Sequence, residues 1–334
     1  MKIRRLHIGN FKSLIDVEIN EPNPFTVFVG PNGSGKSNIF EALEFLNYLN
    51  KSKEVTDVVN IFGGLESILS KNPSKDDRLN IDAHIDSINA YYYIKHSGKT
   101  FGADHGSKGI SATNNFHNLL SLPETYQQFQ QKFSRIFINN TKVLKTVTLS
   151  DEKLNISASN LENVLKRVLE NTNTREDIIE WLQIFVPEFE KIEIQTSTLS
   201  GKNELAIYEK ALKQPLTKNL ISDGTYNILA LLTSIFQSDQ PQFLCIEEPE
   251  NGLNPFVVKQ LVGLFREACE TKGHYIWINT HSQTLVNQLT PEELILVNKK
   301  EGATTIKQLK GTNLHGLNMD EAWLSNALGG GVPW

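Results

Sequence analysis

The sequence predicts an α/β fold in which a mixed, mostly parallel sheet is interrupted by an inserted α+β lobe. In residues 1–52 and again in 217–310, short apolar runs alternate with amphipathic helical segments, which is typical of a parallel sheet. Residues 53–216 lack this alternation and mix strand and helix patterns. We therefore expect a discontinuous core of 1–52 and 217–310, an inserted lobe of 53–216, and a C-terminal helix with a glycine-rich tail over 311–334.

The first core segment reads as strands followed by one helix. Residues 2–8 alternate polar and apolar side chains, and residues 16–19 repeat the pattern after a turn at 10–14, so both predict strands. Residues 25–29 are apolar and partly β-branched, which predicts a buried strand. Apolar side chains at every third position over 40–49 predict an amphipathic helix.

The middle of the chain follows no single period. Residues 79–94 predict two antiparallel strands, and residues 98–115, rich in Gly, Ser, Asn and Thr, predict a mobile loop. Helices are expected at 124–137, 160–170 and 175–186, and strands at 188–195 and 204–209.

The last third returns to alternation. Helices are expected at 223–237, 255–271 and 282–289, and strands at 242–246, 274–279, 294–298 and 304–309. Asn254 followed by Pro255 predicts an N-cap and first helical position.

Composition narrows the class of protein. With 39% apolar and 21% charged residues the chain is an ordinary globular protein. A net charge of −5 argues against a basic coat but leaves a local basic groove open. Cys245 and Cys269 are too far apart for a metal-binding pair, so we expect reduced thiols. No signal peptide opens the chain, and its longest apolar run, 228–236, is too short for a membrane span, so we expect a cytoplasmic protein with no membrane partner.

The sequence GPNGSGKS at residues 30–37, here called the phosphate loop, lies between a predicted strand and a predicted helix. Its glycines allow backbone N–H groups to turn inward around an anion, and the helix adds its positive N-terminal end. This context predicts that Lys36 reaches the β- and γ-phosphates of a nucleotide and that Ser37 binds Mg²⁺. The expected nucleotide ligands of this segment are Gly30, Pro31, Asn32, Gly33, Ser34, Gly35, Lys36, Ser37 and Asn38.

A second pattern, FLCIEEPE at residues 243–250, places two carboxylates at the end of a buried strand. Ligands of α/β sheets bind at this edge. We expect Glu247 to hold the magnesium shell and Glu248 to orient the attacking water. A strand that ends in a solvated turn is the simpler alternative for this motif alone.

Two further motifs have chemical and structural interpretations. His281 follows a predicted strand, where an imidazole could sense the γ-phosphate, although a single histidine is more often a packed or surface residue. Ser222 and Gly224 begin a predicted helix, where they could hold a phosphate or simply cap the helix.

In this order, GPNGSGKS, SDGT, EEPE and TH resemble the Walker A, signature, Walker B and switch-histidine motifs of ABC-type ATPases. The pattern is most similar to the AAA-like branch with RecF, the SMC proteins and the overcoming-lysogenisation-defect proteins. IGNFKSL at 8–14 resembles the N-terminal strand and turn beside the nucleotide base, which adds Lys12 and Ser13 to the expected nucleotide ligands. NGLNP at 251–255 resembles the D-loop. The resemblance covers about residues 1–52 and 217–300.

The resemblance implies an ABC-type P-loop NTPase core that binds ATP and Mg²⁺ and hydrolyses ATP. Two chains would form a head-to-tail dimer, or a higher oligomer, through the ATP sites. Ser222 and Gly224 would act on the partner's nucleotide. The residues that would act within one chain are Lys36, Ser37, Glu247, Glu248 and His281, with Lys36, Glu248 and His281 as the catalytic set.

The sequence departs from the family pattern in three ways. The signature is Ser-Asp-Gly-Thr rather than Ser-Gly-Gly-Gln, and Glu247 stands where many relatives have Asp. No Q-loop glutamine is assigned, because the available candidates lie in an expected helix: Gln127, Gln128, Gln130 and Gln131.

These motifs lead us to expect an ATP-dependent dimer switch that regulates a separately encoded effector or acts on nucleic acid, in defence against mobile DNA or in DNA repair. An ATP-gated scaffold with little turnover stays open, as does a transporter ATPase, which the Glu247 substitution and the N-terminal IGNFKSL disfavour. A built-in nuclease has too few residues after the last predicted strand.

Overall fold

The computed structural model describes residues 2–51, 55–73, 78–85, 88–97, 100–107, 110–112, 131–138, 151–198 and 201–330. The chain divides into two compact units, Met1–Phe133 with Tyr275–Trp334, and Ser134–His274. The bounds of these two units differ from those expected for the ATP-binding core and the inserted lobe. The division of the chain into that core and that lobe stays a prediction. No helix in the described part of the chain is long and apolar enough to cross a membrane.

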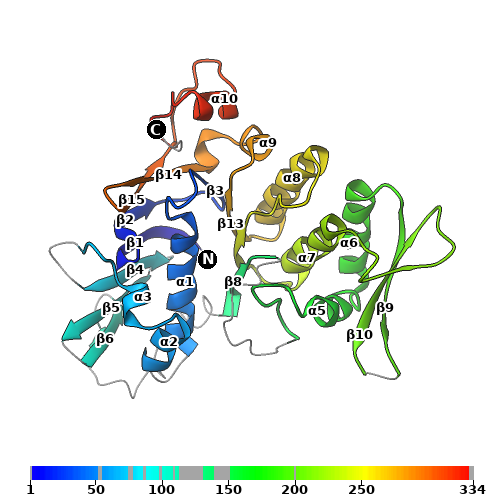
Figure 1. Ribbon diagram of the computed structural model, residues 1–334, viewed down its shortest axis with the longest axis horizontal. Helices are drawn as coiled ribbons and strands as arrows, with labels where there is room; N and C mark the ends of the chain where they lie inside the picture. The colour runs from blue at the N-terminus through cyan, green and yellow to red at the C-terminus, as the bar shows by residue number, and fades with distance from the viewer. Residues whose placement is uncertain are drawn as a thin grey trace. The chain divides into compact units, whose positions relative to one another are not determined.

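The first unit contains an antiparallel sheet with the strand order β2-β1-β4-β5-β6-β7 (Figure 1). Its strands are β1 (Ile3–Phe11), β2 (Leu14–Asn20), β4 (Leu79–Ile85), β5 (Ile88–Ser97), β6 (Thr100–Ser107) and β7 (Ile110–Ala112). The two strands predicted within 79–94 are confirmed, since β4 pairs antiparallel with β5. The loop predicted at 98–115 is wrong over β6 and β7, because cross-strand pairing overrides a composition that favours turns.

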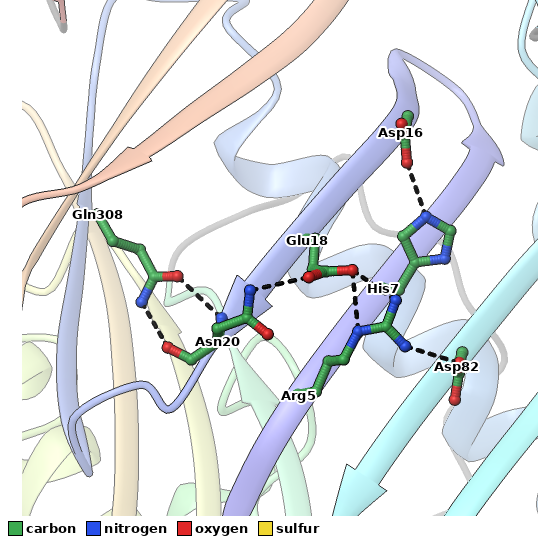
Figure 2. A network of polar contacts seen from close by, with 7 residues as sticks. All are labelled: Arg5, His7, Asp16, Glu18, Asn20, Asp82 and Gln308. Atoms are coloured by element: carbon green, nitrogen blue, oxygen red, sulfur yellow. Dashed lines mark hydrogen bonds and ion pairs between the residues drawn. The ribbon is translucent and has the colours of Figure 1, made fainter.

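One face of this sheet carries a ladder of polar contacts (Figure 2). Arg5 of β1 pairs with Glu18 of β2 and, through Nη1, with Asp82 of β4 at 3.0 Å. Asn20 and Gln308 exchange two hydrogen bonds of 2.8 Å, one in each direction. Solvent-exposed ion pairs of this kind each contribute less than about 1 kcal/mol. The ladder therefore secures the register of neighbouring strands more than it stabilises the fold.

A second set of strands in the first unit has the order β15-β14-β3-β13. β3 (Phe25–Val29) is buried throughout and pairs in parallel with both β13 (Tyr275–Thr280) and β14 (Leu294–Lys300). β15 (Ala303–Gln308) closes the edge as the antiparallel partner of β14. These strands confirm the mixed, mostly parallel arrangement predicted for the core.

Helix α1 (Lys36–Lys51) packs against strands of both sheets in the first unit. The ring of Phe45 lies 5.7 Å from that of Phe11 in β1, and the ring of Phe40 lies 5.5 Å from that of Phe28 in β3. The predicted apolar stripe over 40–49 is confirmed, since Phe40, Leu43, Leu46 and Leu49 are all buried. The first unit also contains α2 (Val55–Ile61), α3 (Leu65–Ile68), α9 (Gln283–Val286), a 3-10 helix (Pro291–Glu293) and α10 (Met319–Leu324).

The second unit is built around α7 (Asp223–Phe236), in which every residue from 227 to 236 is buried. Its other elements are β8 (Phe133–Ile136), α5 (Leu161–Val168), α6 (Thr172–Phe185), β9 (Phe189–Thr196), β10 (Asn203–Glu209), β11 (Leu216–Thr217), β12 (Phe243–Glu247) and α8 (Pro255–Thr271). β9, β10 and β11 form an antiparallel sheet, and β12 lies beside β8.

The expected elements of the second unit are largely confirmed. Helix α8 has the predicted bounds, and Asn254 caps it by accepting a hydrogen bond of 3.0 Å from the Val257 N–H. The helix predicted at 124–137 is wrong where β8 forms, since a strand next to β12 buries Phe133 and Ile136. Gln127, Gln128 and Gln130 lie outside the described residues.

Candidate active site

The phosphate loop connects β3 to α1 in the first unit, as predicted. Gly33 has φ 76° and Gly35 has φ 106°, a conformation that side chains disfavour. A Cβ at Gly35 would lie 2.1 Å from Thr304 Oγ1, and one at Gly30 would lie 2.0 Å from the Val297 carbonyl oxygen. Gly33 has open space around it. Gly30 and Gly35 are therefore required by packing against β14 and β15, and Gly35 by its backbone conformation as well.

A relay of hydroxyl and amide groups supports the loop from behind. Asn38 Nδ2 donates to Ser13 Oγ at 2.8 Å, and Ser13 Oγ lies 2.7 Å from Thr304 Oγ1. Thr304, 2% exposed, donates in turn to the Ser34 carbonyl oxygen at 2.7 Å. Because a hydroxyl has one proton to give, this order requires Ser13 to donate to Thr304. The relay ties two predicted nucleotide ligands, Ser13 and Asn38, to the loop.

The Ser34 hydroxyl is buried and has no hydrogen-bond partner within the described residues. An unpaired buried hydroxyl costs about 1–3 kcal/mol, so it calls for an explanation. A loop that carries an unused polar group and two glycines in the left-handed region fits an anion bound against its backbone. The polar groups and the backbone conformation of the loop are therefore suited to bind the phosphate of a nucleotide.

Lys36 and Ser37 begin α1 at the end of the loop. The buried Lys36 amine donates to the carbonyl oxygens of Gly30, at 2.7 Å, and Pro31, at 3.1 Å. Ser37 Oγ accepts a hydrogen bond of 3.3 Å from Asn279 Nδ2, at the end of β13. The amine is thus held over its own loop, where a phosphate could replace the two carbonyl groups.

Two other predicted residues of the first unit, Lys12 and His281, lie in turns. Lys12, in the turn between β1 and β2, forms an ion pair with Glu41 of α1, with 2.6 Å between Nζ and Oε2. His281 is half-buried in the turn between β13 and α9. The next residue, Ser282, caps α9 by accepting a hydrogen bond from the Leu285 N–H.

The second unit holds the predicted carboxylates in residues 247–254, here called the acidic turn. Glu247 ends β12 and is buried, with its side chain 1% exposed. Arg135 of β8, with its side chain 8% exposed, donates Nε to Glu247 Oε1 at 2.7 Å and forms a second bond to the same oxygen through Nη2. Arg135 therefore supplies the positive charge that a buried carboxylate requires.

Glu248 has a positive φ of 47°, which costs a non-glycine residue of order 1–3 kcal/mol. Its Oε2 accepts a hydrogen bond of 2.9 Å from Asn251 Nδ2, and its carbonyl oxygen accepts one of 3.1 Å from the Asn251 N–H. Backbone strain of this kind is concentrated at functional sites. The strain and the amide contact set the direction of a carboxylate that we expected to orient water.

The motif at the start of α7 is a helix cap, as its simpler interpretation predicted. Ser222 Oγ accepts a hydrogen bond of 3.1 Å from the Thr225 N–H. Gly224 lies so near the acidic turn that its Cβ would stand 2.6 Å from the Gly252 carbonyl oxygen. Asn227 Nδ2 donates to the Asn251 carbonyl oxygen at 2.8 Å. The start of α7 and the acidic turn are therefore in direct contact.

Buried groups around α7 have shifted pKa values. Burial, together with the neighbouring Glu162 carboxylate, raises the pKa of Tyr226, which lies 3.3 Å from the Lys218 amine. Burial also lowers the pKa of His274, whose Nδ1 accepts the Gln242 N–H at 3.1 Å and whose Nε2 lies 3.0 Å from the Ile235 carbonyl oxygen. These two groups support the packing of the second unit.

A magnesium ion that travels with a nucleotide needs little from the protein. It keeps phosphate oxygens and waters and takes one or two protein ligands. The Ser37 hydroxyl and the Glu247 carboxylate have suitable chemistry, and the described residues contain no cluster of three His, Cys, Asp or Glu side chains that would bind a metal alone. Each of these two groups, taken by itself, is a donor of the kind that a nucleotide-bound magnesium accepts, and Arg135 is already bound to one oxygen of the Glu247 carboxylate.

The sequence analysis missed the residues that support the site: Arg135, Asn227, Asn279 and Thr304. Each lies far along the chain from the group it contacts, as with the 112 positions between Arg135 and Glu247. None belongs to a local motif, so no pattern in the sequence could have singled them out. Asn251 was named only as part of the D-loop-like segment, without its contact to Glu248.

Comparison with known proteins identifies a matching family. The model of the family described as "AAA domain, putative AbiEii toxin, Type IV TA system" matches residues 25–287. A chromosome partition protein Smc from Methanocaldococcus jannaschii is 40% identical over 63 residues, which are 19% of this chain and 5% of that protein. A DNA replication and repair protein RecF from Clavibacter michiganensis subsp. michiganensis is 39% identical over 67 residues, 20% of this chain and 17% of that protein.

Solved structures resemble the whole chain. The SMC head domain from Thermotoga maritima has a TM-score of 0.55 at 15% identity, over 92% of this chain and 99% of that one. A Smc head domain with an extended coiled coil bound to the C-terminal domain of ScpA, derived from Pyrococcus furiosus, has a TM-score of 0.60 at 15% identity, over 98% and 99%. These likenesses confirm the predicted fold class.

Proposed function

The chain belongs to this AAA-domain family, in the branch of ABC-type ATPases that includes RecF and Smc, and from this we propose that it binds ATP and hydrolyses it as a pair of identical chains. The observation that carries the proposal is the phosphate loop. It has two glycines in the left-handed region, an unused buried hydroxyl at Ser34 and a lysine amine directed at the loop's own carbonyl groups. The two curated relatives named above match only about a fifth of this chain, and the match covers 5% and 17% of their own lengths. The proposed activity therefore rests on the geometry of the phosphate loop and not on the activities of these relatives.

In this proposal the N–H groups of the phosphate loop and the start of α1 bind the phosphates of ATP. Lys36 leaves the carbonyl groups of Gly30 and Pro31 for the β- and γ-phosphates. Ser37 and Glu247 hold Mg²⁺, which when bound neutralises charge that develops on the phosphates. Glu248 orients the attacking water, and His281 contacts the γ-phosphate. Lys12, Ser13 and Asn38 line the nucleotide, the last two through the Thr304 relay.

The pairing of two chains is part of the same proposal. Ser222 and Gly224 of one chain act on the nucleotide held by the other, so that ATP joins the two chains and hydrolysis releases them. Support comes from the motif order and from family membership. The cap at Ser222 and the glycine contact at Gly224 have a structural role of their own, so the role across the dimer needs a direct test.

Light scattering tests this proposal. With ATP and Mg²⁺, the Glu248→Gln variant is expected to double its mass from 37.6 kDa, because it binds ATP without hydrolysing it. The Lys36→Ala variant is expected to stay at the starting mass. If Glu248→Gln and wild type both keep their mass with saturating ATP, the dimer proposal is wrong.

A second candidate function is an ATP-gated scaffold with slow turnover. The buried pair of Arg135 and Glu247 favours it, since magnesium would have to share the carboxylate with a guanidinium group. Single-turnover and steady-state hydrolysis rates, measured beside nucleotide affinity, separate the two. Tight binding with turnover near the uncatalysed rate would select the scaffold.

The biological role is proposed at lower detail. Relatives named for chromosome partition and for DNA replication and repair support action on DNA or repair. The family description, with its toxin and Type IV system, supports defence. A Smc head solved with a ScpA domain supports a separately encoded protein partner. We propose such an effector, a nucleic acid ligand and a cytoplasmic location.

The proposed binding of nucleic acid is tested by measuring how the ATP-loaded Glu248→Gln variant binds DNA and RNA duplexes as the salt concentration is changed.

A further inference from the structure

Two hydrogen bonds in series link the start of α7 to the side chain of Glu248. Asn227, in the second turn of α7, donates Nδ2 to the Asn251 carbonyl oxygen at 2.8 Å. Asn251 then donates its own Nδ2 to Glu248 Oε2 at 2.9 Å. All three residues belong to the second unit. The path therefore runs from a helix to the carboxylate through one turn of the backbone.

The helix end of this path is closely packed. Asn227 is 4% exposed and lies on a helix that is buried from this residue onward. Close approach of Gly224 and Gly252 holds the helix start against the acidic turn, since a Cβ at Gly224 would clash with the Gly252 carbonyl oxygen at 2.6 Å. Movement of the helix start would therefore carry the acidic turn with it.

The Glu248 end needs such support. Its φ of 47° is disfavoured for a side-chain-bearing residue, and such conformations persist where surrounding contacts impose them. The Asn251 backbone N–H supports this conformation by donating to the Glu248 carbonyl oxygen, and the Asn251 side-chain amide separately holds the Glu248 carboxylate. A hydrogen bond to an ionised group is also stronger than one between neutral groups.

We propose that Asn251 is a positioning residue for the Glu248 carboxylate and that Asn227 holds Asn251 in place. The inference rests on the proposed function, in which Glu248 orients the attacking water. It adds that a movement of α7, which begins with the Ser-Asp-Gly-Thr motif, also moves the Glu248 carboxylate. Asn227 and Asn251 connect the two.

The test uses full-length Asn251→Ala and Asn227→Ala, singly and combined. Loss of an amide contact to a charged group predicts a fall in kcat of about tenfold for Asn251→Ala and about threefold for Asn227→Ala, with KM and nucleotide affinity within about twofold of wild type. Because Asn227 acts through Asn251, the double variant should be no slower than Asn251→Ala alone. If the kcat losses of the two single variants multiply in the double variant, the two asparagines act independently, and the proposal that Asn227 acts through Asn251 is wrong.

A readout apart from hydrolysis uses Glu labelled with ¹³C at the carboxyl carbon, with the Glu248 resonance assigned by its loss in Glu248→Gln. The resonance should move in Asn251→Ala and, by a smaller amount, in Asn227→Ala. Asn163→Ala is the matched control, because Asn163 Nδ2 donates to the Asp151 carboxylate at the same 2.9 Å elsewhere in the second unit. It should change neither the resonance nor kcat, and thermal unfolding checks that every variant is folded.

The outcomes separate the two proposals. If Glu248→Gln abolishes hydrolysis while Asn251→Ala keeps the wild-type kcat and resonance, the positioning role is wrong and the proposed function stands. If Glu248→Gln hydrolyses ATP at the wild-type rate, the role of Glu248 is wrong, and the positioning role falls with it.

Discussion

The phosphate loop and the acidic turn both place chemical groups at the end of a buried strand, but they are held in different ways. In the loop, the glycine backbone, neighbouring hydroxyl groups and the Lys36 amine, which donates to two carbonyl oxygens of the loop, define the shape. In the acidic turn, a buried ion pair and a strained residue define the direction of two carboxylates. The glycine backbone and the Lys36 amine leave the loop ready for an anion, whereas the buried Glu247 carboxylate needs a positively charged partner.

The largest expected effect breaks the charged region. Arg135→Met leaves Glu247 buried without its counter-charge, which predicts a loss of about 3–5 kcal/mol in the free energy of unfolding. Chemical denaturation measures it. Arg4→Met, which breaks an exposed pair with Glu21 at 3.2 Å, is the matched control and should leave the free energy of unfolding close to the wild-type value, because solvent screens an exposed pair. Equal losses in the two variants would contradict a special role for burial.

Restoring neutrality sharpens the same comparison. The double variant Arg135→Met with Glu247→Gln removes both charges, so most of the lost stability should return. Hydrolysis should not return, because the proposed magnesium carboxylate is gone. A double variant as unstable as Arg135→Met alone would show that packing of Arg135, rather than its charge, stabilises the second unit.

The next largest effect is expected in the phosphate loop. Gly35→Ala places a Cβ 2.1 Å from Thr304 Oγ1 at a φ of 106°, so nucleotide binding should weaken by about a hundredfold. Gly33→Ala is the matched control, with a positive φ but open space, and should weaken binding by about tenfold at most. Titration with a fluorescent ATP analogue measures both. Similar losses would mean that backbone conformation alone, without the contact to β15, decides the loop's shape.

A smaller effect comes from the relay behind the loop. Thr304→Val keeps the shape of the side chain and removes the hydroxyl that donates to the Ser34 carbonyl oxygen, so binding should weaken by about five- to tenfold. Thr304→Ser keeps the hydroxyl and should bind within about twofold of wild type. Titration with a fluorescent ATP analogue measures both affinities. Wild-type affinity in Thr304→Val would show that the Thr304 hydroxyl does not support nucleotide binding.

The smallest effect concerns pH. Burial disfavours charged His274, so the unfolded chain takes up a proton near pH 6.5 more readily than the folded one. The free energy of unfolding should therefore hold its value above this pH and fall as the pH drops below it, by at most about 1.4 kcal/mol per unit. Denaturation from pH 7.5 to 5.0 should show a shallower fall in His274→Gln.

Helix and strand patterns predicted much of the architecture because local periodicity reflects local burial. The bounds of α8, its cap at Asn254 and the strand 25–29 follow from such patterns. Two expectations were wrong for a physical reason. Residues 100–107 and 110–112 form strands by pairing with the strand just before them in the chain, which overrides a composition that favours turns, and residues 133–136 form a strand beside the distant β12, which a short window of sequence does not reveal.

By itself the sequence determined the chemical groups of the candidate site and their order, since the phosphate loop and the acidic turn are contiguous motifs whose geometry depends on neighbouring residues. Only the tertiary structure decided what holds them. Arg135 meets Glu247 across 112 positions and Thr304 meets Ser34 across 270. Contacts over such separations arise from strand order and helix packing, which bring together side chains that no local pattern relates.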